Sequence, residues 1–124
     1  MAEIDQKRYY EDIVGHVPPE ISKRIEVGME VDPKLTKMFE DLRIHVMKSE
    51  VINDKTVQML LFGMMAAKLV AAPTRYHAVA AKMAGASKEE LYAVAGLALL
   101  AGGMRSYNTA GAAIAEAFDK PEAD

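Results

Sequence analysis

Alanine is concentrated in one part of this chain. Eighteen of the twenty alanines lie between Ala66 and Ala117, in a stretch otherwise dominated by Leu, Val, Met and Gly, whereas residues 1–58 alternate acids and bases. Strict alternation of apolar and polar residues is missing from the sequence, and good helix formers prevail. We therefore expect an all-α protein with a charged N-terminal part and a buried C-terminal part. Because no Ser/Gly-rich linker separates the parts, residues 1–124 are expected to form a single domain.

Prolines, glycines and capping residues divide the chain into about six predicted helices. Proline is favoured in a first helical turn, small polar residues cap helix starts, and glycine ends helices. The expected helices run from Pro18-Pro19-Glu20 to about Met29, from Pro33 to about Lys48 after a cap at Asp32, onward from a cap at Asp54, from Pro73-Thr74 to about Gly85, from a capping box at Ser87–Glu90 to Gly102-Gly103, and from there to about Phe118.

Two of these helices carry apolar stripes at helical spacing. In the helix after Asp32, the stripe consists of Leu35, Met38, Phe39, Leu42 and Val46. The helix after Asp54 is apolar almost all round and is expected to be central, with its methionines either filling the core or lining a pliable pocket. Its apolar residues are Val57, Met59, Leu60, Leu61, Phe62, Met64, Met65 and Ala66.

Composition excludes several classes of function. The chain has no cysteine, which excludes disulfides, zinc–thiolate sites, iron–sulfur clusters and thiol catalysis by its own residues. A net charge of −3 and 6% aromatic residues argue against a nucleic-acid partner. The N-terminus lacks the apolar segment of a signal peptide, and the longest apolar run, Leu91–Met104, falls short of the roughly 20 residues that span a membrane. We therefore expect a cytoplasmic protein without membrane contact.

The alanine-rich segments leave smooth helix faces, such as Ala110-Gly111-Ala112-Ala113. In a small protein, such faces commonly pack between subunits, because the apolar surface would otherwise face water. We expect a homo-oligomer that uses the faces around Ala110–Ala117. The alternative is that these faces pack only within one chain.

The three histidines differ in their surroundings. His16 stands in a connection beside Pro18, and His45 shares a charged helix face with Asp41 and Lys48, so both are expected at the surface. His77 instead shares a helix face with the small residues Ala80, Ala81 and Ala84, which leaves room beside its imidazole. A histidine there is either a hydrogen-bonded core residue or a proton donor and acceptor near neutral pH. No second ligand follows at i+3 or i+4, so no metal site is expected.

Arg105 lies just after Gly102-Gly103, in the first turn of the last predicted helix. Its guanidinium, with Ser106, Asn108 and the backbone N–H groups of that turn, would form a pocket for a carboxylate. Alternatively, Arg105 covers the helix end or pairs with an acid.

From Lys55 onwards, the chain resembles the carboxymuconolactone decarboxylase family, within the alkylhydroperoxidase-D-like superfamily. The resembling residues are Lys55-Thr56, His77, the segment Gly85-Ala86-Ser87-Lys88-Glu89-Glu90-Leu91, and Ala101–Gly103. The resemblance implies a helical bundle assembled as a trimer or hexamer, without a cofactor. It also implies a lyase of decarboxylase type acting on a small carboxylate or lactone. His77 would be the general acid and base, Gln58 a neutral partner that orients it, and Arg105 the carboxylate anchor.

The chain departs from the peroxidase branch of that superfamily. The two cysteine positions of the branch read Val70 and Pro73, and its glutamate position reads Gln58, an amide that cannot act as a base. Thiol peroxidase activity is therefore expected only if a partner protein supplies the thiols. The main alternative to a lyase is a non-catalytic oligomeric binding or assembly protein. An open, polar-lined space beside His77 would favour the lyase.

Overall fold

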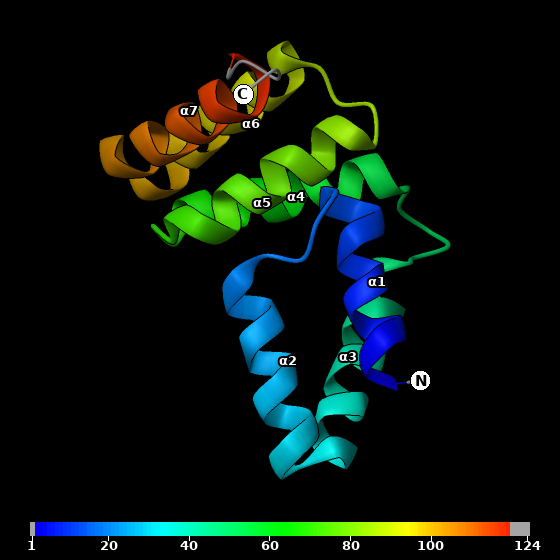
Figure 1. The fold of residues 1–124 in the computed structure, drawn as a ribbon. Helices are drawn as coiled ribbons and strands as arrows, with labels where there is room; N and C mark the ends of the chain where they lie inside the picture. Colours follow the sequence, from blue (N-terminus) through cyan, green and yellow to red (C-terminus); the bar gives the residue numbers. More distant parts are fainter. Residues whose placement is uncertain (1, 120–124) are drawn as a thin grey trace. The chain divides into compact units, whose positions relative to one another are not determined.

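A computed structural model describes residues 2–119, and Figure 1 shows the path of the chain. Every regular element in this part of the chain is a helix, which confirms the all-α prediction. The helices are α1 (Ala2–Val14), α2 (Pro19–Val31), α3 (Pro33–Met47), α4 (Asp54–Ala67), α5 (Ala71–Met83), α6 (Lys88–Gly102) and α7 (Met104–Asp119). They form two compact units, one up to Val51 and one from Ile52.

Seven helices stand where about six were predicted, because α1 was missed. This helix lies in the charged N-terminal segment, where few apolar residues mark a helical period. It ends before Gly15, whose φ of +86° is a conformation that glycine adopts readily. The other predicted boundaries agree with the structure to within a few residues.

The caps explain most of these boundaries. Asp32 Oδ1 accepts a hydrogen bond from the Leu35 N–H at 3.0 Å, as predicted for the start of α3. For α4 the predicted cap, Asp54, is wrong: Asn53 caps the helix, accepting from the Thr56 N–H at 2.8 Å, and Asp54 is the first helical residue. Both residue types cap helices well, so the local pattern does not distinguish neighbours in an Asn-Asp pair.

The first unit, α1 to α3, buries a polar cluster around Glu40 as well as the apolar Ile25 and Val14. Glu40 is fully buried, with Arg24 Nη1 2.7 Å from its Oε2 and the Tyr10 hydroxyl donating to its Oε1 at 2.9 Å. Helices α2 and α3 pack closely at Gly28, where a Cβ atom would lie 2.2 Å from Thr36 Oγ1. Thr36 and Glu40 are thus the buried residues of α3.

The apolar stripe of α3 consequently lies on the outside of this unit. Because Thr36 and Glu40 occupy the inner face, the residues about 100° or more around the helix from them point outward. All five stripe residues, Leu35, Met38, Phe39, Leu42 and Val46, are exposed. The stripe is therefore not part of the core of this unit.

The second unit, α4 to α7, contains the hydrophobic core. Helix α4 packs against α5, α6 and α7, which confirms that it is central. However, Met64 is exposed and does not fill the core as predicted. The core residues are Phe62, Ala66, Ala78, Ala81, Ala86, Leu91, Ala95, Ala98, Ala110, Ala113 and Ile114.

This core changes the interpretation of the smooth face on α7. Ala110 and Ala113 are buried within their own chain, so they are not available to a second subunit. Small side chains here serve close packing between helices. The prediction of an interface around Ala110–Ala117 is thus wrong for Ala110 and Ala113.

None of the helices in the described part of the chain is long and apolar enough to cross a lipid bilayer.

Candidate functional site

Gln58 and His77 meet between α4 and α5. A connection of three residues joins these helices, which makes them antiparallel neighbours and places the second turn of α4 beside the later half of α5. The imidazole Nδ1 of His77 lies 2.8 Å from Gln58 Oε1. Gln58 is buried, whereas His77 is half-buried. The structure thus brings together the two residues expected to act as a pair.

The hydrogen bond determines which ring nitrogen of His77 carries the proton. An amide oxygen only accepts, so Nδ1 is the donor to Gln58 Oε1. In the neutral ring the lone pair then resides on Nε2, and this is the atom that takes up or delivers a proton. Gln58 cannot itself exchange a proton at ordinary pH. In this pair, Gln58 therefore orients the ring, and His77 is the residue that can exchange a proton.

One turn before Gln58, Lys55 connects α4 to the start of α6. Its Nζ atom lies 3.0 Å from Glu90 Oε2, and Glu90 also completes the predicted capping box with Ser87. The Ser87 backbone N–H and the Lys55 ammonium both hold the pKa of Glu90 below its ordinary value. Lys55 and Gln58 are three residues apart and share a helix face. The Lys55–Glu90 ion pair therefore holds the first turn of α4, one turn before Gln58.

The three residues predicted to bind a carboxylate are not at this pair. Ser106 is fully buried, and its hydroxyl donates to the Ala67 carbonyl oxygen at 3.4 Å, at the end of α4. Ser106 therefore serves helix packing in this chain and does not line an open pocket. Arg105 and Asn108 are exposed on either side of it. Ala67 is nine residues from Gln58, which corresponds to about 13 Å along the helix axis.

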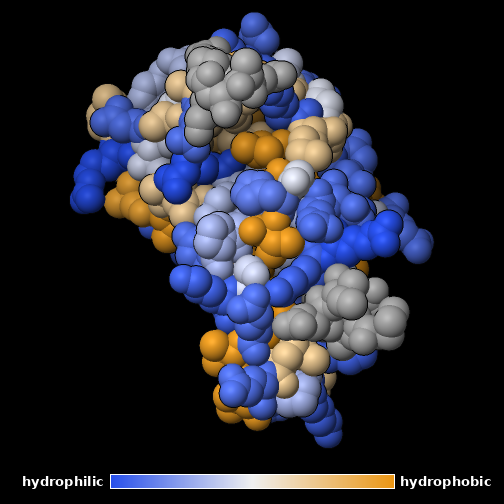
Figure 2. Space-filling view, viewed as in Figure 1, coloured by the Kyte–Doolittle hydropathy of each residue, from blue (hydrophilic) through white to orange (hydrophobic). Residues whose placement is uncertain are grey.

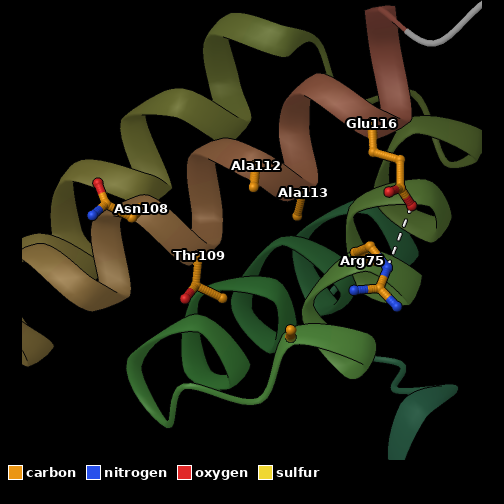
Figure 3. A pocket seen from close by; sticks show the side chains of 7 residues that line it. Arg75, Asn108, Thr109, Ala112, Ala113 and Glu116 are labelled. Carbon is orange, nitrogen blue, oxygen red and sulfur yellow. Dashed lines mark ion pairs between the residues drawn. The ribbon is translucent and has the colours of Figure 1, made fainter.

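A separate pocket lies between α5 and α7, with a volume of about 350 Å³. Figure 3 shows Arg75 at one end, with its guanidinium directed toward Glu116, and Nε lies 3.3 Å from Glu116 Oε1. Arg75 and His77 are two residues apart and leave α5 in different directions, as expected from helical geometry. This pocket was not predicted from the sequence, because its lining comes from helices distant along the chain, although Asn108, one of the residues predicted to bind a carboxylate, lies in it. The lining residues are Ala71, Arg75, Asn108, Thr109, Ala112, Ala113 and Glu116.

The other two histidines lie at the surface, as predicted. His16 is exposed between α1 and α2, and His45 is exposed near the end of α3. Within the described residues, no group of three or more His, Asp or Glu side chains is arranged to hold a metal ion.

Comparison with solved structures supports this fold. A protein from Burkholderia xenovorans LB400, provisionally described as a carboxymuconolactone decarboxylase, has a crystal structure that matches with a TM-score of 0.78. The two proteins share 21% sequence identity, and the match covers 94% of this chain and 88% of that one. No curated protein sequence matched significantly. The family model for carboxymuconolactone decarboxylases matches residues 33–117, which include α3 to α6 and most of α7. This chain belongs to the carboxymuconolactone decarboxylase family.

Proposed function

We propose that this protein is a cofactor-free lyase of decarboxylase type, acting on a small organic acid or lactone. The observation that carries the proposal is the 2.8 Å hydrogen bond between His77 Nδ1 and Gln58 Oε1. It holds the imidazole, a side chain that can both give and take a proton, in one orientation and one tautomer. Family membership supports the same class of reaction.

The chemistry requires one proton transfer. In a decarboxylation, the bond between the carboxylate carbon and its neighbour breaks and CO₂ leaves, while the electron pair moves onto an adjacent carbonyl as an enolate. The carbon then takes up a proton, which the protonated His77 ring delivers from Nε2. Water restores that proton in the next cycle. A positioned acid or base of this kind contributes about 10²- to 10⁴-fold to a rate.

We do not assign the carboxylate anchor of this reaction to Arg105 of the same chain. The start of α7 lies against the end of α4, where Ala67 is about 13 Å along the helix axis from Gln58. We therefore propose Arg105 and Asn108 as substrate-binding residues only where α7 of another subunit approaches His77. A thiol peroxidase remains chemically excluded for this chain's own residues, since Val70 and Pro73 carry no thiolate.

One observation favours a second candidate, a non-catalytic binding or assembly protein. It is the separation of the His77 pair from every group that was expected to hold the substrate. In that case His77 would act only as a hydrogen-bonded link between α4 and α5.

A substitution at His77 distinguishes the two candidates. Muconolactone-type and β-keto acids are screened for CO₂ release with the wild-type protein. For any substrate found, His77→Gln should lower the rate about 10²- to 10⁴-fold while the melting temperature changes little. The matched control is His45→Gln, on an exposed position of α3, which should leave the rate unchanged. An unchanged rate with a lower melting temperature in His77→Gln would instead establish the structural role.

A further inference from the structure

The pocket between α5 and α7 has both of its charged groups at one end. Arg75 and Glu116 form an ion pair there, and among the seven lining residues, all of them in the described part of the chain, only these two are charged. Their side chains retain 40% and 50% of their exposure, so a molecule from solution can reach both. The pocket is therefore neutral overall but presents one cation and one anion side by side.

This ion pair is loose enough to accept a ligand. Arg75 Nε lies 3.3 Å from Glu116 Oε1, whereas charge-assisted N–H···O hydrogen bonds are about 2.7–2.9 Å long. An exposed pair of this kind contributes little to folding stability, so a shift of either side chain costs little. Figure 3 shows the two terminal nitrogens of Arg75 on the side of the guanidinium away from Glu116. These nitrogens can hold a carboxylate in the bidentate geometry that arginine favours.

The rest of the lining is neutral and suits a flat apolar group with a polar tip. The alanines of the lining leave a smooth surface of methyl groups between the two helices: Ala71, Ala112 and Ala113. Thr109 lies at the end away from Arg75 (Figure 3), about 10.5 Å along the helix axis from Glu116. The Thr109 hydroxyl donates to the Arg105 carbonyl oxygen at 2.8 Å, so its oxygen can accept a further hydrogen bond. Figure 2 likewise shows hydrophilic and hydrophobic residues intermixed over the upper part of the view, which includes α5 and α7.

We propose that this pocket binds an aromatic α-amino acid. The carboxylate of the ligand binds Arg75, its ammonium group binds Glu116, and its ring lies over the alanine methyl groups toward Thr109. An α-amino acid carries both charges close together and is neutral overall, which matches the charges of the lining. An aromatic ring adds a large, rigid contact area at a low cost in conformational entropy. The pocket volume of about 350 Å³ is near the lower end of the range for ligand pockets, as expected for a molecule of this size.

Ligands of other charge fit the pocket less well. A simple carboxylate is repelled by Glu116, and a simple amine is repelled by Arg75. A purely apolar molecule would remove both charged groups from water without replacing their hydrogen bonds, which is costly. The site is also separate from the Gln58–His77 pair, because Arg75 and His77 leave α5 in different directions. The proposal therefore stands whether or not His77 is catalytic.

Ligand analogues test the charge pattern on the wild-type protein. L-phenylalanine is titrated into isotopically labelled protein while the backbone amide signals are followed by NMR. Two matched probes are phenethylamine, which lacks the carboxylate, and hydrocinnamate, which lacks the ammonium group. L-phenylalanine should shift the signals of Ala71, Thr109 and Ala113, and each analogue should bind at least about tenfold more weakly, since each loses a hydrogen bond between charged groups. Equal affinity for either analogue, signal shifts only outside the pocket, or no binding at millimolar concentration would overturn the proposal.

Matched variants locate the two charges that hold the ligand. Arg75→Gln and Glu116→Gln should each weaken L-phenylalanine binding by about tenfold or more, with an unchanged helical circular dichroism spectrum. The controls, Arg8→Gln on α1 and Glu89→Gln on α6, remove the same charges at exposed positions outside the pocket and should bind like the wild type. If the two pocket variants bind as tightly as these controls, the ion pair does not hold the amino acid and the proposal fails. Should either pocket variant not fold, the analogue series on the wild-type protein still decides.

Discussion

The Lys55 ammonium lies 3.0 Å from Glu90 Oε2, although 35 residues separate the two along the chain. Glu90 at the same time accepts from the Ser87 backbone N–H at 2.9 Å, so one carboxylate caps α6 and holds the first turn of α4. Two of the segments that carry the family resemblance therefore contact each other. The contact holds the start of α4, one turn before the residue that meets His77.

Removing the cap should weaken the second unit. Ser87→Ala deletes the oxygen that accepts from the Glu90 N–H, and loss of such a cap lowers the free energy of unfolding by about 1 kcal/mol. Urea denaturation followed by circular dichroism measures the change. Glu89→Gln, an exposed neighbour outside the capping box, is the control and should change stability less than Ser87→Ala does.

The Glu90 carboxylate should make stability depend on acid pH. Because its pKa in the folded protein lies below the ordinary value of 4.5, the ionised form contributes stability above that value, and this contribution is lost as the pH falls through the folded pKa. Glu90→Gln should therefore melt at a lower temperature than the wild type at pH 7. The difference should shrink below about pH 4. A difference that stays constant between pH 7 and pH 3 would contradict the assignment.

Replacing Gln58 by glutamate should change how His77 titrates. Gln58→Glu places a carboxylate beside Nδ1, where it favours the imidazolium and raises the pKa of His77 relative to the wild type by about one unit or more. NMR titration of the ring protons measures this shift. As the raised pKa is on the histidine, the added stability is present at low pH and is lost as the pH rises through the folded value. An unshifted titration would mean that the two side chains do not interact in solution.

Tyr10 should ionise at a higher pH than an ordinary tyrosine. Burial is the main cause that raises its pKa from 10.0 to about 12, and the nearby Glu40 adds to this. The raised value means that folding stability falls as the pH rises from 10 toward 12. Tyr10→Phe should remove the step near pH 12 from an absorbance titration of tyrosinate. It should also lower the free energy of unfolding at pH 7 by about 1–3 kcal/mol, since Glu40 loses a buried donor.

Local signals in the sequence predicted the helix boundaries well. The capping box at Ser87 and the break at Gly103, where φ is +89°, depend on residues within one turn of each other. These helix ends can therefore be predicted without knowledge of the fold. The same locality explains the failure at Asp54, because Asn53 beside it satisfies the same pattern equally well.

Local signals of this kind could not predict contacts between residues that are distant along the chain. The spacing of Leu42 and its stripe indicates an amphipathic helix, but which side faces inward depends on Arg24 and Tyr10, both on other helices. Glu40 alone appears as one more surface acid in a charged segment. Only the fold shows that its charge is compensated and buried, and hence that the stripe faces outward.

The candidate site was predictable to the extent that it depends on the family. The resemblance placed Gln58 beside His77, and the two residues meet in the structure. Arg105 was grouped with them because its helix start suits an anion. Its distance from His77 is set by the antiparallel packing of α4 and by the contact of Ser106 with Ala67, neither of which has a local pattern.

The connection between α2 and α3 consists of Asp32 alone. The backbone N–H of this residue donates to the Gly28 carbonyl oxygen at the end of α2, and its side chain caps α3. The length of the connection is therefore constrained at both ends. An added or deleted residue there would rotate α3 by about 100° relative to α2 and turn Glu40 away from Arg24. The connection from Lys48 to Asn53 is longer and contains the boundary between the two units. Relatives of this protein should therefore differ in length at the second connection, while the α2–α3 hairpin keeps its residue count.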